Sequence, residues 1–176
     1  MRGVPSKVLP IITYPNDQLT QVADKVTEFD DELQQLVVNM IATTLSYDGI
    51  GLAAPQVGVN KRIIVVVLQD NPLALINPVV MEGKGKVRSK EGCLSVPGYF
   101  DDIERFDEIT VSYQTTQGET KESTGKGLLA IVVQHEIDHL NGKMFLDYLS
   151  PFKQKRAKDK VIKTIKKLRK IGRQLI

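Results

Sequence analysis

The sequence predicts an α+β fold, in which small antiparallel or mixed β-sheets pack around a central buried helix. Three observations lead to this prediction. The stretch 128–133 is apolar on every side of the predicted helix, which is typical of a fully buried helix. The run 63–67 is short and β-branched, which favours a buried strand. The residues of 109–115 alternate between apolar and polar, as those of a half-buried strand do.

Length and composition indicate the number of domains and exclude some classes of protein. The chain has 176 residues, of which 41% are hydrophobic and 26% charged, so we expect one domain spanning 1–176 with a sizeable core. No apolar run approaches the roughly 18 residues of a membrane-spanning helix, so no membrane partner is expected. The single cysteine excludes an intrachain disulfide and indicates a cytoplasmic protein.

An N-terminal helix is predicted over 31–48. Asp30 is a favourable N-cap residue, and apolar side chains then recur at helical spacing. Gly49 follows, and glycine readily takes the left-handed conformation that ends many helices. The stretch 49–56 is rich in glycine and alanine, so we expect a loop after the helix.

Strands are predicted over 62–68 and 73–81. Pro78 interrupts the second strand, and because proline has no N–H group it belongs at a sheet edge or a bulge. The stretch 83–90 is predicted as a basic loop or hairpin.

A strand over 109–115, a turn at 117–118 and a return strand are expected to form a hairpin. The central helix is predicted over 125–141, with Gly142 as its natural end.

The net charge of +3 conceals a strong asymmetry. The segment 150–176 holds 11 Lys and Arg residues against one acid and carries +10, whereas 1–149 carries −7. Within that segment we predict a basic C-terminal helix over about 151–171, capped by Ser150. A polyanionic partner would explain this charge, and so would an ordinary solvated amphipathic helix.

The strongest chemical signal is the sequence His-Glu-Ile-Asp-His at 135–139. His135 and His139 are one helical turn apart on the same face, so both can bind one metal ion. They are the only histidines of the chain, and they lie in an apolar helix where polar side chains are costly without a purpose. Glu136 is placed to act as general base on a metal-bound water.

The third ligand decides which class of metal site this is. In one group of zinc proteases a third histidine follows the motif, but the corresponding residue here is Phe145. No Glu or His occurs after His139, which leaves Asp147, Asp159 or an upstream residue. Cys93 is the preferred candidate, although a free cysteine is often only a small buried hydrophobe. One sulfur and two nitrogens with an open fourth position are typical of a hydrolytic metal site, and by ligand type alone they indicate zinc.

Three segments together resemble a known family. The stretches 49–56 (GIGLAAPQ), 91–95 (EGCLS) and 134–142 (QHEIDHLNG) are similar to the three signature motifs of peptide deformylase and occur in the same order. The resemblance extends over roughly 8–170. It implies removal of the formyl group from the N-terminal formylmethionine of nascent polypeptides, with release of formate. The formylmethionyl peptide is then the substrate.

The resemblance also implies a cofactor and ligands. One divalent metal ion would be bound by Cys93, His135 and His139, with water as the fourth ligand. The family is known for Fe2+, which zinc, nickel or cobalt often replaces. We therefore expect Fe2+, with Zn2+, Ni2+ and Co2+ as alternatives.

Three further residues receive catalytic roles by the same resemblance. Glu136 would deprotonate the water and later pass the proton to the leaving amine. The side-chain amide of Gln56 and the backbone N–H of Leu94 would stabilise the tetrahedral oxyanion.

The glycines of the motifs are expected to hold the substrate. An extended peptide can add to an exposed strand edge, and Gly49, Gly51 and Gly92 allow the backbones to approach closely. The resemblance places three apolar residues beside the formylmethionine side chain: Ile50, Ile131 and Val132.

Three charged residues are expected to support the site. Glu91, Arg105 and Asp138 are candidates for orienting the histidines, and an ordinary surface role for Arg105 is a second interpretation. The stretch 97–102 (PGYFDD) departs from relatives that often carry a basic residue there, so we expect a changed rim of the methionine pocket.

Two alternative functions are weighed against this hypothesis. A zinc metallopeptidase is disfavoured because the downstream third ligand is missing. A ribosome- or RNA-binding module with a structural metal would use the basic C-terminal helix, whose apolar stripe is Val161, Ile165 and Leu168. That helix would also let an enzyme of nascent chains dock on the ribosome, so the two readings are compatible. DNA is not expected as a partner.

Overall fold

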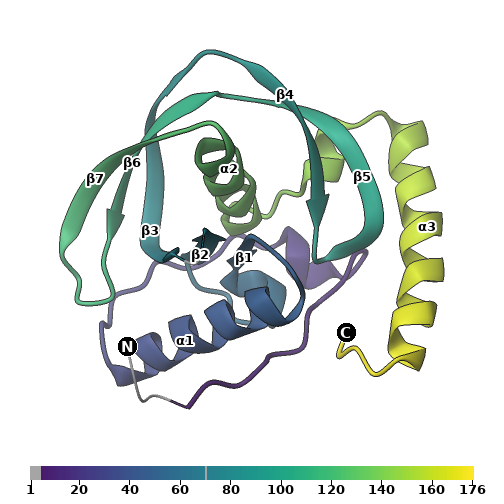
Figure 1. The fold of residues 1–176 in the computed structure, drawn as a ribbon, viewed down its shortest axis with the longest axis horizontal. Helices are drawn as coiled ribbons and strands as arrows, with labels where there is room; N and C mark the ends of the chain where they lie inside the picture. The colour runs from purple at the N-terminus through teal and green to yellow at the C-terminus, as the bar shows by residue number, and fades with distance from the viewer. Residues whose placement is uncertain (1–4, 70) are drawn as a thin grey trace.

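The computed structural model describes residues 5–69 and 71–176 and has an α+β fold (Figure 1). Its three α-helices are α1 (Asp31–Ser46), α2 (Leu128–Leu140) and α3 (Pro151–Lys170), and its short 3-10 helices are η1 (Asp17–Thr20), η2 (Ala54–Val57) and η3 (Phe145–Tyr148). The strands are β1 (Gly51–Ala53), β2 (Ile63–Leu68), β3 (Asn71–Lys84), β4 (Val87–Cys93), β5 (Val96–Arg105), β6 (Glu108–Gln114) and β7 (Thr120–Lys126). The predicted fold class is therefore confirmed.

The strands form two sheets. Five strands pair in the order β1-β2-β3-β6-β7, and β4 pairs with β5 alone. Every pair of named strands is antiparallel, so the sheets are antiparallel rather than mixed. Strand β1 is an edge of the larger sheet, which leaves one side of its backbone free to pair with another chain.

Pro78 lies at a bulge in β3, which is one of the two positions predicted for it. The pairing of β3 with β6 shifts register between Ile76 and Val79, so the missing N–H group of Pro78 interrupts no ladder. Asn77 takes a left-handed conformation there (φ 50°), and its side chain exchanges two hydrogen bonds with the backbone of Val26.

The predicted loop or hairpin over 83–90 is wrong: the stretch holds the end of β3 and the start of β4, and these two strands belong to different sheets and do not pair with each other. Strand β5, the partner of β4, was not predicted. Strand β5 contains Pro97, Gly98, Asp101 and Asp102, which have low strand propensity. Pairing with β4 and packing against α3 override that propensity.

Two buried apolar clusters hold these elements together, and β2 contributes to both. Its side chains alternate, so Ile63 and Val65 join a cluster with α1, α3 and β5, whereas Ile64 and Val66 join one with α2 and β6. Burial on both faces explains why the run is apolar throughout. In Figure 1, α2 lies inside the curve of the strands.

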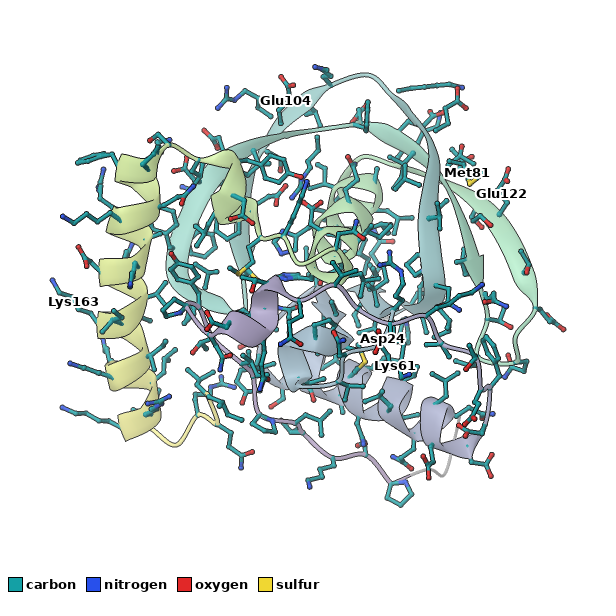
Figure 2. All side chains as sticks on the ribbon, turned by 180° about the vertical axis from the view of Figure 1, so that it is seen from behind. Asp24, Lys61, Met81, Glu104, Glu122 and Lys163 are labelled. Atoms are coloured by element: carbon teal, nitrogen blue, oxygen red, sulfur yellow. The ribbon has the colours of Figure 1, made fainter. Side chains whose placement is uncertain are left out.

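Helix α3 runs along β5 at the side of the molecule (Figure 1), and the side chain of Lys163 projects outward from it (Figure 2). Ser150 caps the helix through a hydrogen bond to Lys153 N, and the side chains buried beneath it are Ala157, Val161 and Ile165. Beyond it, the backbone of 174–176 bonds to that of 11–13, which anchors the end of the chain.

Candidate active site

Helix α2 and strand β4 bring three ligand-type side chains together. His135 and His139 share one face of α2, with ring centroids 5.2 Å apart, and Cys93 ends β4. The sulfur of Cys93 is 3.3 Å from His139 Nε2. The ligand atoms of these residues all lie within 4.8 Å of one another, so the group could hold a metal ion.

The surroundings of this group fit a metal ion. One sulfur and two imidazole nitrogens form a donor set that soft and borderline divalent metals favour. Oε2 of Glu136, one residue after His135, is a buried carboxylate oxygen without a hydrogen-bond partner in the described chain. An unpaired buried carboxylate is costly, so a nearby cation or a proton is needed to balance it.

A buried ion-pair network contacts His135. Glu91 Oε2 is 2.8 Å from His135 Nδ1, which leaves Nε2 for the cluster. Arg105 donates to both oxygens of Glu91, at 2.7 and 3.0 Å, and to Asp138 at 2.6 Å. Arg105 is 6% exposed, so the surface interpretation of this residue is wrong. Tyr148 adds a hydrogen bond to Asp138 at 3.0 Å.

Burial and charge set the proton affinities of these groups. Burial raises the pKa of Glu136 to about 7. Burial would also raise the pKa of Glu91, but hydrogen bonds from Arg105 and His135 hold it below its usual value. The two histidines differ. Burial lowers the pKa of His139, and the positive His135 and Arg105 lower it further. For His135, contacts with Cys93 and Glu91 outweigh burial and raise the pKa.

Gln56 is held beside Cys93 by three contacts. Its side-chain oxygen accepts a hydrogen bond from Ala53 N at 2.9 Å, and its amide nitrogen donates to Ser95 Oγ at 3.0 Å and lies 3.4 Å from Cys93 Sγ. Gln56 is 1% exposed. A neutral N–H donor is therefore fixed at the edge of the metal-capable group.

A cavity of about 540 Å³ opens onto the cluster. Its lining includes most of the predicted site residues, namely Gly49, Ile50, Gly51, Gln56, Glu91, Gly92, Cys93, Leu94, Ile131, Val132, His135 and Glu136. His139 belongs to the metal-capable group but does not line the cavity, and Arg105 and Asp138 lie behind Glu91 and His135.

The glycines of the cavity are packed against its other residues. A Cβ atom on Gly51 would lie 2.5 Å from Glu136 Oε1 and 2.8 Å from Val132 Cγ1. A Cβ atom on Gly49 would lie 2.9 Å from Leu94 Cδ1, and one on Gly92 would collide with the ring of Phe100. The absence of side chains at these positions therefore lets Glu136, Leu94 and Phe100 pack directly against the backbone.

Sequence reasoning missed several residues of the site. One of them is Ser95, which contacts Gln56, and its position in the second motif, two residues after Cys93, is a usable signal. Tyr148 contacts the network from η3, the element that follows α2 along the chain, and no local pattern in the sequence indicates this contact. The cavity is also lined by Leu128 and Phe100 and by three residues near the C-terminus: Leu168, Arg173 and Leu175.

The fold and the site together define a class: an α+β protein with a partly exposed cysteine and two buried histidines beside a carboxylate and a fixed amide donor, which is the arrangement of a metal-dependent hydrolase. Comparison with known proteins gives the family. The model of the polypeptide deformylase family matches residues 8–155, and the chain belongs to that family.

Individual relatives agree with this membership. The peptide deformylase of Alkalilimnicola ehrlichii is 43% identical over 163 residues, covering 90% of this chain and 92% of the relative. A crystal structure of the Legionella pneumophila peptide deformylase matches with a TM-score of 0.89 and 40% identity, covering 93% of this chain and 98% of that one. A Met-Ala-Ser-bound structure of the class I type b enzyme from Acinetobacter baumannii matches with a TM-score of 0.79 and 36% identity over 82% of this chain and 100% of that one.

The predicted activity, removal of the N-formyl group from nascent peptides, is confirmed by this membership. The metallopeptidase and the RNA-binding module with a structural metal find no support in the comparisons. Among residues 5–69 and 71–176, no helix is long and apolar enough to cross a membrane.

Proposed function

We propose that Cys93, His135 and His139 bind the metal of this deformylase and that Glu136 is its general base. The observation that carries this proposal is the meeting of three ligand atoms within 4.8 Å at a cavity that Glu136 also lines. When bound there, a divalent metal lowers the pKa of a coordinated water and polarises the formyl carbonyl. We infer Fe2+ as the working metal, with Zn2+, Ni2+ or Co2+ as substitutes, from the resemblance to the family.

The substrate enters as an extended chain. Strand β1 is a sheet edge, and Gly49 and Gly51 allow the peptide backbone to approach it. The formylmethionine side chain fits the apolar part of the cavity, lined by Ile50, Ile131 and Val132. The Met-Ala-Ser-bound structure of the Acinetobacter baumannii relative supports a short peptide that begins with methionine as a ligand.

The proposed reaction is hydrolysis of the formyl amide. Glu136 takes a proton from the attacking water as its oxygen bonds to the formyl carbon. The developing oxyanion receives hydrogen bonds from the Gln56 amide and the backbone N–H of Leu94. Glu136 then gives the proton to the methionine nitrogen as the carbon–nitrogen bond breaks, which releases formate and a free amino terminus.

Glu91, Arg105 and Asp138 are proposed as positioning residues. The contact between Glu91 and His135 Nδ1 fixes which imidazole nitrogen faces the cluster, and Arg105 holds Glu91 in place. Ser95 is proposed to position Gln56, because its hydroxyl oxygen accepts a hydrogen bond from the Gln56 amide. Each residue acts through the one that it contacts.

The formate assay tests this function. Protein prepared without oxygen and loaded with Fe2+ is expected to release formate from a formyl-Met peptide. The rate should fall on exposure to air, because Fe2+ oxidises, and return when nickel replaces the iron. Absence of formate from protein shown to hold metal would overturn the assigned roles.

We also propose that α3 docks on the ribosome. Its exposed lysines and arginines are complementary in charge to ribosomal RNA. Because nascent chains are made on the ribosome, the proposal also places the enzyme in the cytoplasm. Charge reversal at Lys158, Lys166 and Lys167, which are exposed on α3 and line neither the catalytic cavity nor its neighbouring cleft, is expected to weaken salt-dependent ribosome binding while formate release stays unchanged. Unchanged ribosome binding in this folded variant would refute the docking role.

A further inference from the structure

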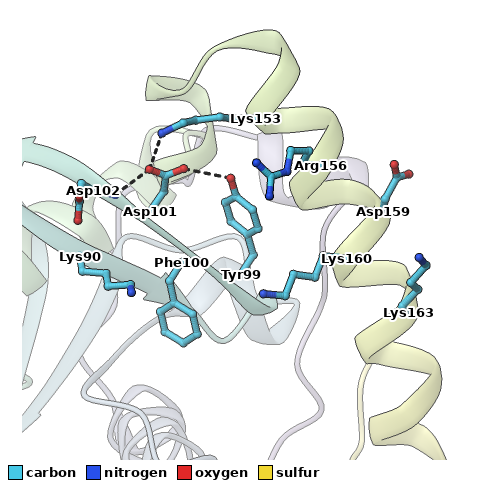
Figure 3. Close-up of a pocket in the computed structure, with 10 residues that line it drawn as sticks. All are labelled: Lys90, Tyr99, Phe100, Asp101, Asp102, Lys153, Arg156, Asp159, Lys160 and Lys163. Atoms are coloured by element: carbon cyan, nitrogen blue, oxygen red, sulfur yellow. Dashed lines mark hydrogen bonds and ion pairs between the residues drawn. The ribbon is translucent and has the colours of Figure 1, made fainter.

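The catalytic cavity continues into a second cleft. This cleft, of about 610 Å³, lies between β5 and α3, and its lining shares Lys90 and Phe100 with the catalytic cavity (Figure 3). The ring of Phe100 packs against Gly92, the residue before Cys93, yet Phe100 is 58% exposed. An exposed aromatic ring therefore stands where the two spaces join.

The lining of the second cleft holds five cations, Lys90, Lys153, Arg156, Lys160 and Lys163, and three acids, Asp101, Asp102 and Asp159, so its cations outnumber its acids. Lys153 is paired with Asp101 at 2.8 Å, whereas Lys90, Arg156 and Lys160 form no ion pair within the described part of the chain. Arg156 and Lys160 extend from α3 toward β5, and Lys90 extends beside Phe100 (Figure 3). Positive charge thus follows the ring of Phe100 along the path away from the catalytic centre.

We propose that the peptide residues beyond the formylmethionine pass Phe100 and enter this cleft, where an acidic side chain pairs with Lys90, Arg156 or Lys160. The proposal rests on the proposed function, because it needs the amino terminus in the neighbouring cavity. An extended chain advances about 3.3 Å per residue, so successive substrate positions reach the ring and then the cations. The kcat/KM of the enzyme therefore depends on the charge of the substrate residues that follow the first ones.

The second cleft is continuous with the catalytic cavity, and this favours the substrate peptide as its occupant over a separate anionic molecule. Lys90 and Phe100 belong to both linings, so a chain with its end beside Glu136 leaves the cavity directly over them. An apolar side chain fits against the exposed ring, and an acidic one fits a lining whose cations outnumber its acids. A basic side chain at the same position would be repelled.

A peptide series tests the proposal. Formyl-Met peptides of equal length carry alanine throughout, except for one Asp, Ala or Lys placed in turn at the third, fourth and fifth residues. At one of these positions kcat/KM should follow the order Asp, Ala, Lys. One or two partly exposed ion pairs should make kcat/KM at low salt about threefold to tenfold higher for the Asp peptide than for the Lys peptide. The difference should shrink as salt is raised.

Two matched variants locate the effect. Lys160→Glu changes a cleft residue, and Lys166→Glu makes the same charge change on the same helix outside both linings. We expect Lys160→Glu to abolish or reverse the preference and Lys166→Glu to retain it. Calorimetric binding of the already deformylated peptides should give the same order without turnover.

Three results would overturn the proposal. Equal kcat/KM for the Asp and Lys peptides, with the all-alanine peptide turned over normally, would refute it and leave the proposed function intact. Equal loss of preference in both variants would assign the effect to the general charge of α3 rather than to the cleft. No turnover of any peptide by metal-loaded protein would overturn the proposed function, and this proposal with it.

Discussion

The interior beside α2 and the surface of α3 hold charge in opposite ways. In the interior a single cation, Arg105, makes three hydrogen bonds to two carboxylates, Glu91 and Asp138, and all three side chains are mostly buried. On α3, lysines and arginines are numerous and exposed, and the described residues of the helix form one ion pair, between Lys153 and Asp101. The interior therefore has few charges with many partners, and α3 has many charges with few partners.

This difference shows where a single residue matters. A buried charge that loses its partner remains in a medium of low dielectric constant, so one substitution has a large cost. Exposed charges are screened by water and salt, so they act through their sum. The interior is suited to fixing the geometry of a catalytic group, and α3 is suited to steering and docking.

Substitution Glu136→Gln should give the largest functional effect. It removes the proposed general base but no proposed ligand, so the variant should bind metal normally while kcat falls about 10²- to 10⁴-fold. Because the carboxylate is buried with an unpartnered oxygen, the amide should not lower stability. Formate release, metal content and thermal unfolding are measured on the same preparation. Wild-type rates in a metal-loaded variant would refute the assigned role.

Substitution Arg105→Met tests the interior network. It leaves Glu91 and Asp138 without their cation, and we expect a loss of about 3–5 kcal/mol in the free energy of unfolding. The matched control is Lys86→Met, which breaks the exposed pair with Glu104 and should cost less than about 1 kcal/mol. Urea unfolding compares the two in the same metal state.

A further variant covers the case in which Arg105→Met does not fold. Arg105→Lys keeps the charge but loses the bidentate contact with Glu91, so an intermediate loss of stability is expected. Equal, small losses for the Arg105 variants and Lys86→Met would show that burial does not distinguish the two regions.

Much of this fold and site was predictable because the signals are local. The spacing of His135 and His139 defines one helix face, and the cap at Asp30 and the cap at Ser150 mark helix starts that the structure confirms within one residue. The motifs at Gln56 and Cys93 indicated that distant segments meet, because they matched a family as a set. Their individual spacing carried no such information.

The remaining features depend on contacts that no local pattern records. Strand β5 exists because β4 and α3 pack against it, although its own residues disfavour a strand. Tyr148 reaches Asp138 only through the path of the chain after α2. The predicted start of α2 at residue 125 was wrong for a related reason. Gly125 and Lys126 pair with β6, so the helix begins at Leu128.

Substitution Gly51→Ala tests how closely the interior is packed around the proposed base. The added Cβ would lie 2.5 Å from Glu136 Oε1, so the carboxylate must move. We expect kcat/KM to fall about 10- to 100-fold, because small displacements of catalytic groups are costly. The control is Gly125→Ala, where the nearest atoms belong to the flexible end of Leu129 at 3.3 Å. Equal activity of the two variants would contradict the packing argument.

The smallest expected effect belongs to the ion pair of α3. Asp101 accepts a hydrogen bond from Lys153 at 2.8 Å, and this contact holds the pKa of Asp101 below its usual value. A carboxylate with a lowered pKa in the folded state stabilises the protein above its unfolded-state pKa. That contribution is lost as the pH falls below about 4. Since the Lys153 side chain is 46% exposed, the loss in Asp101→Asn should stay under about 1 kcal/mol at neutral pH.

Unfolding by urea at neutral and at acidic pH measures this contribution. The wild type should exceed Asp101→Asn in stability at neutral pH, and the difference should disappear in acid, where both side chains are uncharged. Salt should weaken the difference at neutral pH, whereas the cost of Arg105→Met should respond little to salt because that network is buried. If Asp101→Asn lowered the free energy of unfolding as much as Arg105→Met does, and independently of salt, charge on α3 would be organised like charge in the interior.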